Sequence, residues 1–185
     1  SATKMVADDI MARLGFTEQN IIRSSFARPN LSYAVRHTDD KTEQLLRVIH
    51  NVQGAGIVYM RSREGCEQLA TELQKQGISA SYYHAGLPHA ERSLRQEEWT
   101  EGKVRIMVAT NAFGMGIDKA DVRFVVHYTM CDSLESYYQE AGRAGRDGKR
   151  SYALLLVSSD DDSKIVKRFD AEFPPLEEIK SIYEK

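Results

Sequence analysis

Short apolar runs alternate with amphipathic stretches along the chain from about residue 56, and this alternation predicts the fold. Five runs rich in Val, Ile, Leu and Tyr predict strands, and most lack the polar–apolar alternation of a half-exposed strand. Continuous apolar strands are typical of a parallel sheet that helices cover on both faces. The predicted strands are GIVYM (56–60), SASYYHA (79–85), VRIMVAT (104–110), RFVVHY (123–128) and SYALLLV (151–157).

Amphipathic segments lie between and around these strands. One predicted helix covers 64–76, and another opens at Pro88 and has Leu94 and Trp99 among its apolar positions. Repeated strand–helix–strand units favour right-handed crossovers, so we expect an α/β fold with a doubly wound, mostly parallel sheet and helices on both faces. Further helices are predicted over 3–14, 41–52, 134–141 (capped by Ser133 or Asp132), from the acidic segment 158–163 to about 169, and over 176–183, with extended segments at 21–26 and 31–38.

These elements divide the chain into three regions. Residues 1–40 form a lead-in of one helix and extended segments, 41–170 form a lobe, and 171–185 begin a following segment or domain. A first residue of serine rather than methionine suggests a piece of a longer polypeptide.

The composition of the 185 residues sets limits on function. A formal net charge of −2 gives no overall basic surface, so any nucleic acid must bind through a local cluster. No run of about 18 apolar residues and no signal-peptide pattern occurs, so we expect no membrane partner and a cytoplasmic location, nucleoid-associated in a bacterium. Cys66 and Cys131 are too few for a four-thiolate zinc site, so we expect reduced thiols and no metal in this chain.

The segment QEAGRAGRDG (139–148) carries the first candidate chemistry. If the helical period of 134–141 continues into it, Gln139 and Arg143 share a face and Arg146 follows three residues later. Guanidinium groups presented among glycines suit the neutralisation of charge on a γ-phosphate. A solvated basic helix end is the alternative, because basic residues also favour the negative end of the helix dipole.

A glycine-rich segment follows the predicted strand 104–110. Thr110 and Asn111 stand at the carboxyl end of that strand, where open α/β sheets place ligands. Gly114 and Gly116 permit a turn, and Asp118 offers a carboxylate to a ribose hydroxyl. The alternative is a plain glycine turn in which Asp118 caps the next segment.

Two more strand ends offer groups for an anion. Arg61, Ser62 and Arg63 come directly after a strand and at a helix N-terminus, and His84 and Gly86 follow the next strand. All lie at carboxyl ends of neighbouring strands, so they are expected to line one groove with Thr110 and Asn111. His84 alone is more typical of a structural or surface histidine than of a ligand.

In combination these strings resemble the superfamily 2 helicases in their RecQ form. The segments 109–128 and 133–148 resemble motifs V and VI, the segment 56–87 resembles motif IV and its continuation, and Ala2–Thr3 resembles the tail of motif III, at the junction between two lobes. Arg61 stands where the family often has Asn, and Ala120 where Pro is common. The family's four-cysteine zinc module has no counterpart after motif VI in this chain.

The resemblance implies a RecA-like C-terminal lobe of an ATP-driven 3′→5′ DNA helicase. By resemblance, Arg146 is the arginine finger, Arg143 and Gln139 support it, and Asp118 and Gly116 lie near the nucleotide. The residues at 61–63, 84, 86, 110 and 111 would contact single-stranded DNA. The chain has no GxxxxGK[ST] phosphate loop and no DExH/DEAD-type acidic segment, so ATP and Mg²⁺ would be held mainly by a first RecA-like lobe of the same polypeptide.

This interpretation predicts an enzyme that is inactive in the present piece alone. Two alternatives stay open: an RNA-directed superfamily 2 lobe, and a non-motor module that binds nucleic acid or protein. A non-motor module needs tight binding by the lobe alone, whereas we expect a Kd of about 10⁻⁵ M or weaker for single-stranded DNA.

Overall fold

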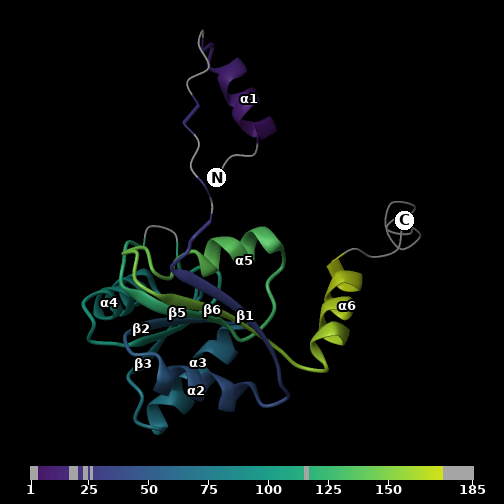
Figure 1. Ribbon diagram of the computed structural model, residues 1–185. Helices are drawn as coiled ribbons and strands as arrows, with labels where there is room; N and C mark the ends of the chain where they lie inside the picture. Colours follow the sequence, from purple (N-terminus) through teal and green to yellow (C-terminus); the bar gives the residue numbers. More distant parts are fainter. Residues whose placement is uncertain (1–3, 17–20, 23–24, 26, 115–116, 173–185) are drawn as a thin grey trace.

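A fully parallel sheet forms the centre of the computed structural model, which describes residues 4–16, 21, 22, 25, 27–114 and 117–172. Its six strands run in the order β1-β6-β5-β2-β4-β3 (Figure 1). Every pairing is parallel, which confirms the predicted sheet type. The strands are β1 (Leu31–His37), β2 (Ala55–Tyr59), β3 (Ala80–Tyr83), β4 (Ile106–Ala109), β5 (Val122–His127) and β6 (Ser151–Val157).

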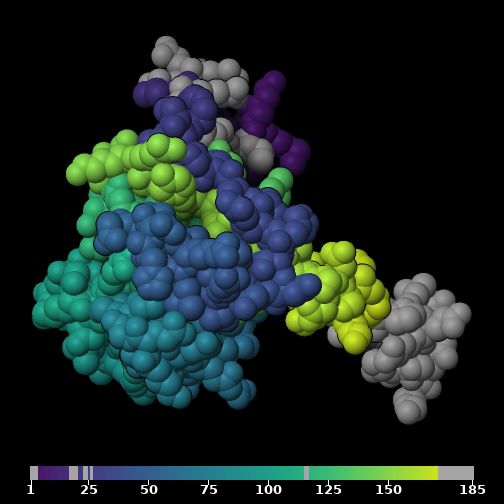
Figure 2. All heavy atoms as spheres, turned by 60° about the horizontal axis from the view of Figure 1, so that its bottom comes forward, coloured from purple at the N-terminus to yellow at the C-terminus, as the bar shows by residue number. Residues whose placement is uncertain are grey.

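Helices cover both faces of this sheet, as predicted (Figure 1). On one face α2 and α3 pack Leu45 and Leu73 into an apolar cluster, and on the other α4 and α5 pack Trp99 and Ala141. In Figure 2 the atoms of α2 and α3 cover their face, and α6 lies at its side. The helices are α1 (Lys4–Arg13), α2 (Lys41–Asn51), α3 (Arg63–Lys75), α4 (His89–Thr100), α5 (Leu134–Ala141) and α6 (Asp161–Glu172).

The inner strands are largely apolar because their residues alternate between the two clusters. In β5, Phe124 and Val126 join the cluster under α2 and α3, whereas Val125 joins the cluster under α4 and α5. All three side chains are fully buried. A strand buried on both faces has no solvent side for polar residues, which explains the continuous runs.

A buried ion pair joins three elements near the end of β5. Lys41 at the start of α2 lies 2.6 Å from Asp161 at the start of α6, and both side chains are 9% exposed. Lys41 also donates to the carbonyl of Tyr128, 3.0 Å away. Burial raises the pKa of Asp161, but hydrogen bonds from Lys41 and Ser158 outweigh it and lower the pKa below its usual value.

Several boundaries and one core residue differ from the predictions. Leu94 is 55% exposed, because five residues at about 100° each set it roughly 140° around α4 from the buried Trp99. Strand β1 belongs to the sheet although it precedes residue 41, and α6 continues past residue 170 to Glu172. These features do not test the division of the chain into 1–40, 41–170 and 171–185, which stays a prediction.

Two further expectations concern the C-terminal helix and a possible membrane span. The helix predicted over 176–183 lies outside the described residues. Among the described helices, none combines the length and apolar character needed to cross a bilayer.

Candidate functional site

The segment with Arg143 and Arg146 forms a turn rather than a continuation of α5. Ser133 caps the start of α5 as predicted, since its Oγ accepts from the N–H of Ser136 at 3.1 Å. The helix ends at Ala141, as predicted for 134–141, but its period does not continue into the next residues, because Gly145 has a positive φ of 64° and donates its N–H to the carbonyl of Val122. We call residues 142–148 the arginine turn.

Both arginines of this turn bond to the backbone of the glycine-rich segment after β4. Arg143 donates from Nη1 to the carbonyl of Gly114 at 2.5 Å, and Arg146 donates from Nη1 to the carbonyl of Ile117 at 3.1 Å. Arg146 also lies 4.0 Å from Asp118, whose side chain is 95% exposed. The structure thus brings together Arg143, Arg146 and Asp118, while the predicted Gly116 lies outside the described residues.

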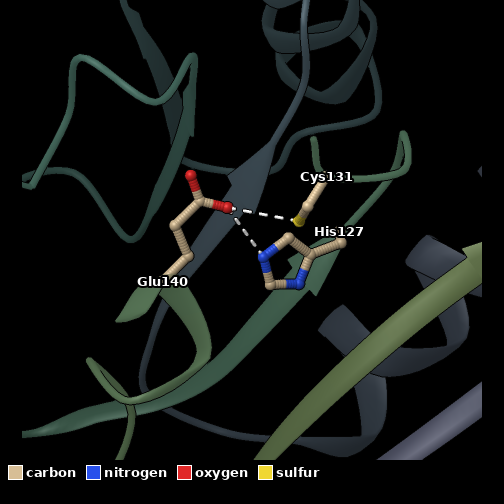
Figure 3. Close-up of side chains that lie close together, drawn as sticks. All are labelled: His127, Cys131 and Glu140. Carbon is tan, nitrogen blue, oxygen red and sulfur yellow. Dashed lines mark hydrogen bonds and ion pairs between the residues drawn. The ribbon is translucent and has the colours of Figure 1, made fainter. Parts of the chain in front are cut away.

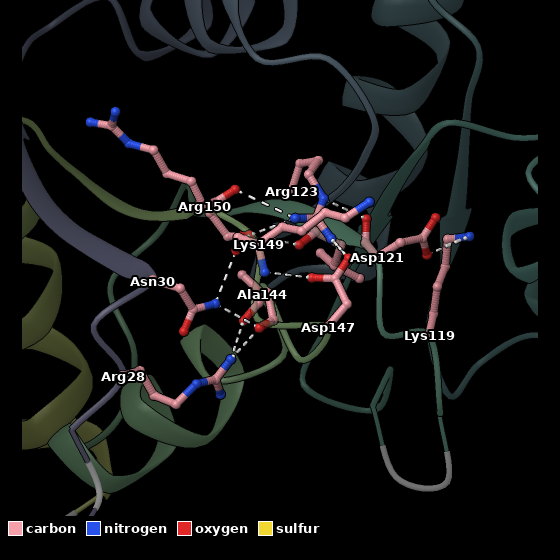
Figure 4. A network of polar contacts seen from close by, with 12 residues as sticks. Arg28, Asn30, Lys119, Asp121, Arg123, Ala144, Asp147, Lys149 and Arg150 are labelled. Carbon is pink, nitrogen blue, oxygen red and sulfur yellow. Dashed lines mark hydrogen bonds and ion pairs between the residues drawn. The ribbon is translucent and has the colours of Figure 1, made fainter.

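Two residues far away in the sequence hold the arginine turn from the other side (Figure 4). Arg28 donates from Nη2 to the carbonyls of Ala144 (3.0 Å) and Gly145 (2.6 Å), and Nη1 lies 3.4 Å from the carbonyl of Gly142. Asn30 donates to the carbonyls of Gly145 and Lys149. Neither residue was predicted from the sequence, because both lie between the extended segments expected at 21–26 and 31–38 and belong to no motif.

An ion pair fixes the far end of the same turn. Arg123 of β5 lies 2.5 Å from Asp147, whose N–H also donates to the carbonyl of Ala120. The hydrogen bond from Arg123 lowers the pKa of Asp147. The arginine turn is therefore anchored along its whole length.

Gln139 does not share a face with Arg143, contrary to the prediction. It is exposed and lines a groove of about 620 Å³ with Arg28, Tyr33, Tyr138 and other residues on the outer side of α5. The predicted shared face required the helix to continue through Arg143, and the helix ends before it.

Arg61 and Asn111 are brought together at the carboxyl edge of the sheet, as predicted. Both are exposed and line one cavity of about 70 Å³. Arg61 forms an ion pair with Asp132, which also pairs with Arg168 at 3.2 Å. The positive charge of Arg61 is therefore partly compensated by Asp132. Thr110 is nearly buried, and its N–H donates to the carbonyl of Tyr83 at 3.1 Å.

Arg63, His84 and Gly86 form a second group at this edge. An added Cβ on Gly86 would lie 3.1 Å from Arg63 and 3.2 Å from His84, so the three are in contact. The His84 ring is 4% exposed and bonds to Glu67 at 2.8 Å, which makes a direct contact with a phosphate unfavourable. Ser62 caps α3 by accepting from the N–H of Gly65. Arg63, exposed at the first position of α3, is the cation best placed for an anion.

The parallel sheet, the arginine turn and the polar residues at the carboxyl edge of the sheet are consistent with one class of protein, which comparison with known sequences identifies. Residues 40–148 match the model of the helicase conserved C-terminal domain, and the chain belongs to that family.

Relatives of the chain include RecQ-family DNA helicases. The chain is 46% identical over 164 residues to the ATP-dependent DNA helicase hus2/rqh1 of Schizosaccharomyces pombe, covering 87% of this chain and 12% of that protein. It is 52% identical over 125 residues to the ATP-dependent DNA helicase Q5 of Rattus norvegicus, covering 68% and 13%. With the RecQ-like DNA helicase BLM of Xenopus laevis it shares 41% over 177 residues, covering 93% and 13%. The chain therefore spans about an eighth of each of these relatives.

Solved structures agree on the fold. A DEAD box protein from Methanococcus jannaschii superposes with a TM-score of 0.67 at 25% identity, over 89% of this chain and 46% of that one. The Escherichia coli DEAD-box protein SrmB superposes with a TM-score of 0.66 at 28% identity, over 79% and 87%. The RecA-like helicase lobe predicted from the sequence is thus confirmed.

Proposed function

We propose that this chain is the second motor lobe of an ATP-dependent 3′→5′ DNA helicase of the RecQ family. In this proposal it completes an ATPase site whose phosphate loop and Mg²⁺ carboxylates belong to a first lobe of the same polypeptide. The observation that carries the proposal is the arginine turn. Arg143 and Arg146 each bond to the backbone of the glycine-rich segment, from a turn that is itself held by several backbone bonds, in a chain whose sequence has no phosphate loop.

The residues of the arginine turn fit a triphosphate. Each guanidinium has five N–H donors, and the bonds to Gly114 and Ile117 use only part of them. The Nε of Arg143 is buried and has no partner in the described part of the chain. ATP would supply a γ-phosphate whose charge grows during transfer, and Arg146, 39% exposed, is the better placed of the two to meet it.

The remaining residues of this site have supporting roles in the proposal. Arg143 fixes the glycine-rich segment against the arginine turn, and Asp118 accepts from the ribose. The position of Gln139 on the outer side of α5 favours a contact with the other lobe rather than with the nucleotide.

The carboxyl edge of the sheet is the proposed contact for single-stranded DNA. Arg61, Arg63, Gly86 and Asn111 are exposed there and can meet the sugar–phosphate backbone. Ser62, His84 and Thr110 shape this edge through the bonds described above. Backbone contacts carry no base information, so we expect binding that tolerates sequence and weakens with salt. We favour DNA over RNA because the relatives named as DNA helicases share 41–52% identity with the chain.

Turnover in the complete helicase tests the proposal. Arg146→Ala should lower the DNA-stimulated ATPase rate by about 10³-fold or more while ATP still binds, because the finger acts on the transition state. Arg47→Ala is the matched control, since Arg47 is 63% exposed on α2 and pairs only with Glu43 among the described residues. Unchanged turnover in Arg146→Ala, or ATPase activity of the isolated chain, would contradict the proposal.

A further inference from the structure

Three side chains with metal-binding atoms meet beside the end of β5 (Figure 3). His127 ends β5, Cys131 lies in the following loop and Glu140 belongs to α5. The Nε2 of His127 lies 2.9 Å from an Oε2 of Glu140, and the Cys131 thiol donates to the same oxygen at 3.5 Å. All three donor atoms lie within 4.8 Å of one another.

We propose that His127, Cys131 and Glu140 bind a Zn²⁺ ion. One imidazole nitrogen, one thiolate and one carboxylate are donors that Zn²⁺ accepts, and three protein donors leave a fourth position open. Tetrahedral bonds of about 2.0–2.3 Å set donor atoms about 3.3–3.6 Å apart. The observed separation of 3.5 Å between Cys131 and Glu140 lies within that range, and the 2.9 Å between His127 and Glu140 lies just below it. Small side-chain rotations therefore suffice to admit the ion.

The surroundings of the three donors suit an ion with a bound water. His127 is fully buried, and its ring packs between the rings of Tyr59 and Tyr137 at 5.5 and 4.7 Å, which fixes its orientation. The donors line the cavity of about 70 Å³, room for an ion and a water at about 30 Å³ per water. The Oγ1 of Thr129 also lines it and is buried without a partner among the described residues, so a bound water would satisfy it.

Ion binding replaces the present hydrogen bond between Cys131 and Glu140. The Cys131 thiol now donates to the Glu140 carboxylate, whereas Zn²⁺ binds the thiolate, so binding displaces that proton. The proposal revises the expectation of no metal, and it stands whether or not the lobe belongs to a motor.

The sequence did not point to this site because its donors are dispersed. His127 and Cys131 are four apart across the end of a strand, and Glu140 follows nine residues later. That spacing matches none of the short metal motifs, and only the packing of α5 against β5 closes the triangle.

Cobalt titration of the reduced chain tests the proposal, because Co²⁺ reports a thiolate ligand through a charge-transfer band. We expect a near-ultraviolet band that Zn²⁺ abolishes by displacing Co²⁺. Cys131→Ser should lose the band, and Glu140→Gln should weaken Zn²⁺ binding by at least about tenfold. Cys66→Ala is the matched control, since it removes the other thiol, in the core cluster under α3, and should keep the band.

Each outcome decides the matter. A band in the unaltered chain and in Cys66→Ala that disappears in Cys131→Ser supports the site. No band with cobalt in excess, or a band that survives Cys131→Ser, overturns it. If Cys131→Ser fails to fold by circular dichroism, Glu140→Gln decides instead, and unchanged Zn²⁺ affinity in that variant overturns the site.

Discussion

Arg28 holds the arginine turn, and replacing it with alanine tests how strongly the turn depends on that support. Its two shorter hydrogen bonds, to Ala144 (3.0 Å) and Gly145 (2.6 Å), are charge-assisted, whereas the 3.4 Å approach to Gly142 is too long to contribute much. A hydrogen bond to a charged group contributes about 1.5–3 kcal/mol, and the partial exposure of Arg28 favours the lower end. Arg28→Ala should therefore lower the unfolding free energy by about 2–3 kcal/mol.

Urea unfolding of the chain measures that loss, and ATPase turnover in the complete helicase measures its consequence. A loosened turn misplaces Arg146, and a shift of about 1 Å in a catalytic group costs about 100-fold in rate. We expect a lower kcat with unchanged ATP affinity, whereas Arg47→Ala should alter neither quantity. A loss of stability below about 0.5 kcal/mol together with normal turnover would refute the supporting role of Arg28.

Four further predictions rest on particular contacts. Lys41→Met leaves the Asp161 carboxylate buried without its cation and should lower the unfolding free energy by about 3 kcal/mol in urea titrations; a loss below about 1 kcal/mol would contradict the pair. Because the folded-state pKa of Asp161 is lowered, its contribution is complete above the unfolded-state pKa of about 3.9 and disappears as the pH falls through the folded value, so Asp161→Asn should flatten stability measured across that acid range. Gly145→Ala places a side chain at a positive φ and sets its Cβ 2.6 Å from the Asn30 amide nitrogen. This variant should lower the unfolding free energy by at least about 2 kcal/mol in urea or thermal unfolding. An unchanged midpoint would mean that the turn relaxes freely. Arg63→Ala should reduce the slope of log K against log salt for single-stranded DNA by about one in the complete helicase, and an identical slope would exclude a phosphate contact.

The layers of the fold were predictable because burial on both faces leaves a direct trace in the sequence. The strand Val122–His127 contains four buried apolar residues, Val122, Phe124, Val125 and Val126, so its pattern identified it without any long-range information. Leu94 was assigned wrongly because helical periodicity gives the angle between two residues, and a short helix with one large buried residue leaves the buried face undefined.

The candidate site was predictable only where its residues are adjacent in the sequence. Arg143 and Arg146 stand in one short string, but the end of α5 at Ala141 depends on a hydrogen bond from Gly145 to Val122, which a local pattern does not contain. Arg28 contributes through contacts more than 100 residues away. The predicted cytoplasmic location stays a prediction.

The central claim is that Arg146 acts on the transition state of ATP hydrolysis at a site shared by two lobes. Its most direct test is the affinity of the complete helicase for ADP with aluminium fluoride, which mimics the transferring phosphoryl group, relative to ADP alone. The account predicts that Arg146→Ala lowers the ratio of these affinities by about 100-fold or more while ADP binding is unchanged. An unaltered ratio would contradict it.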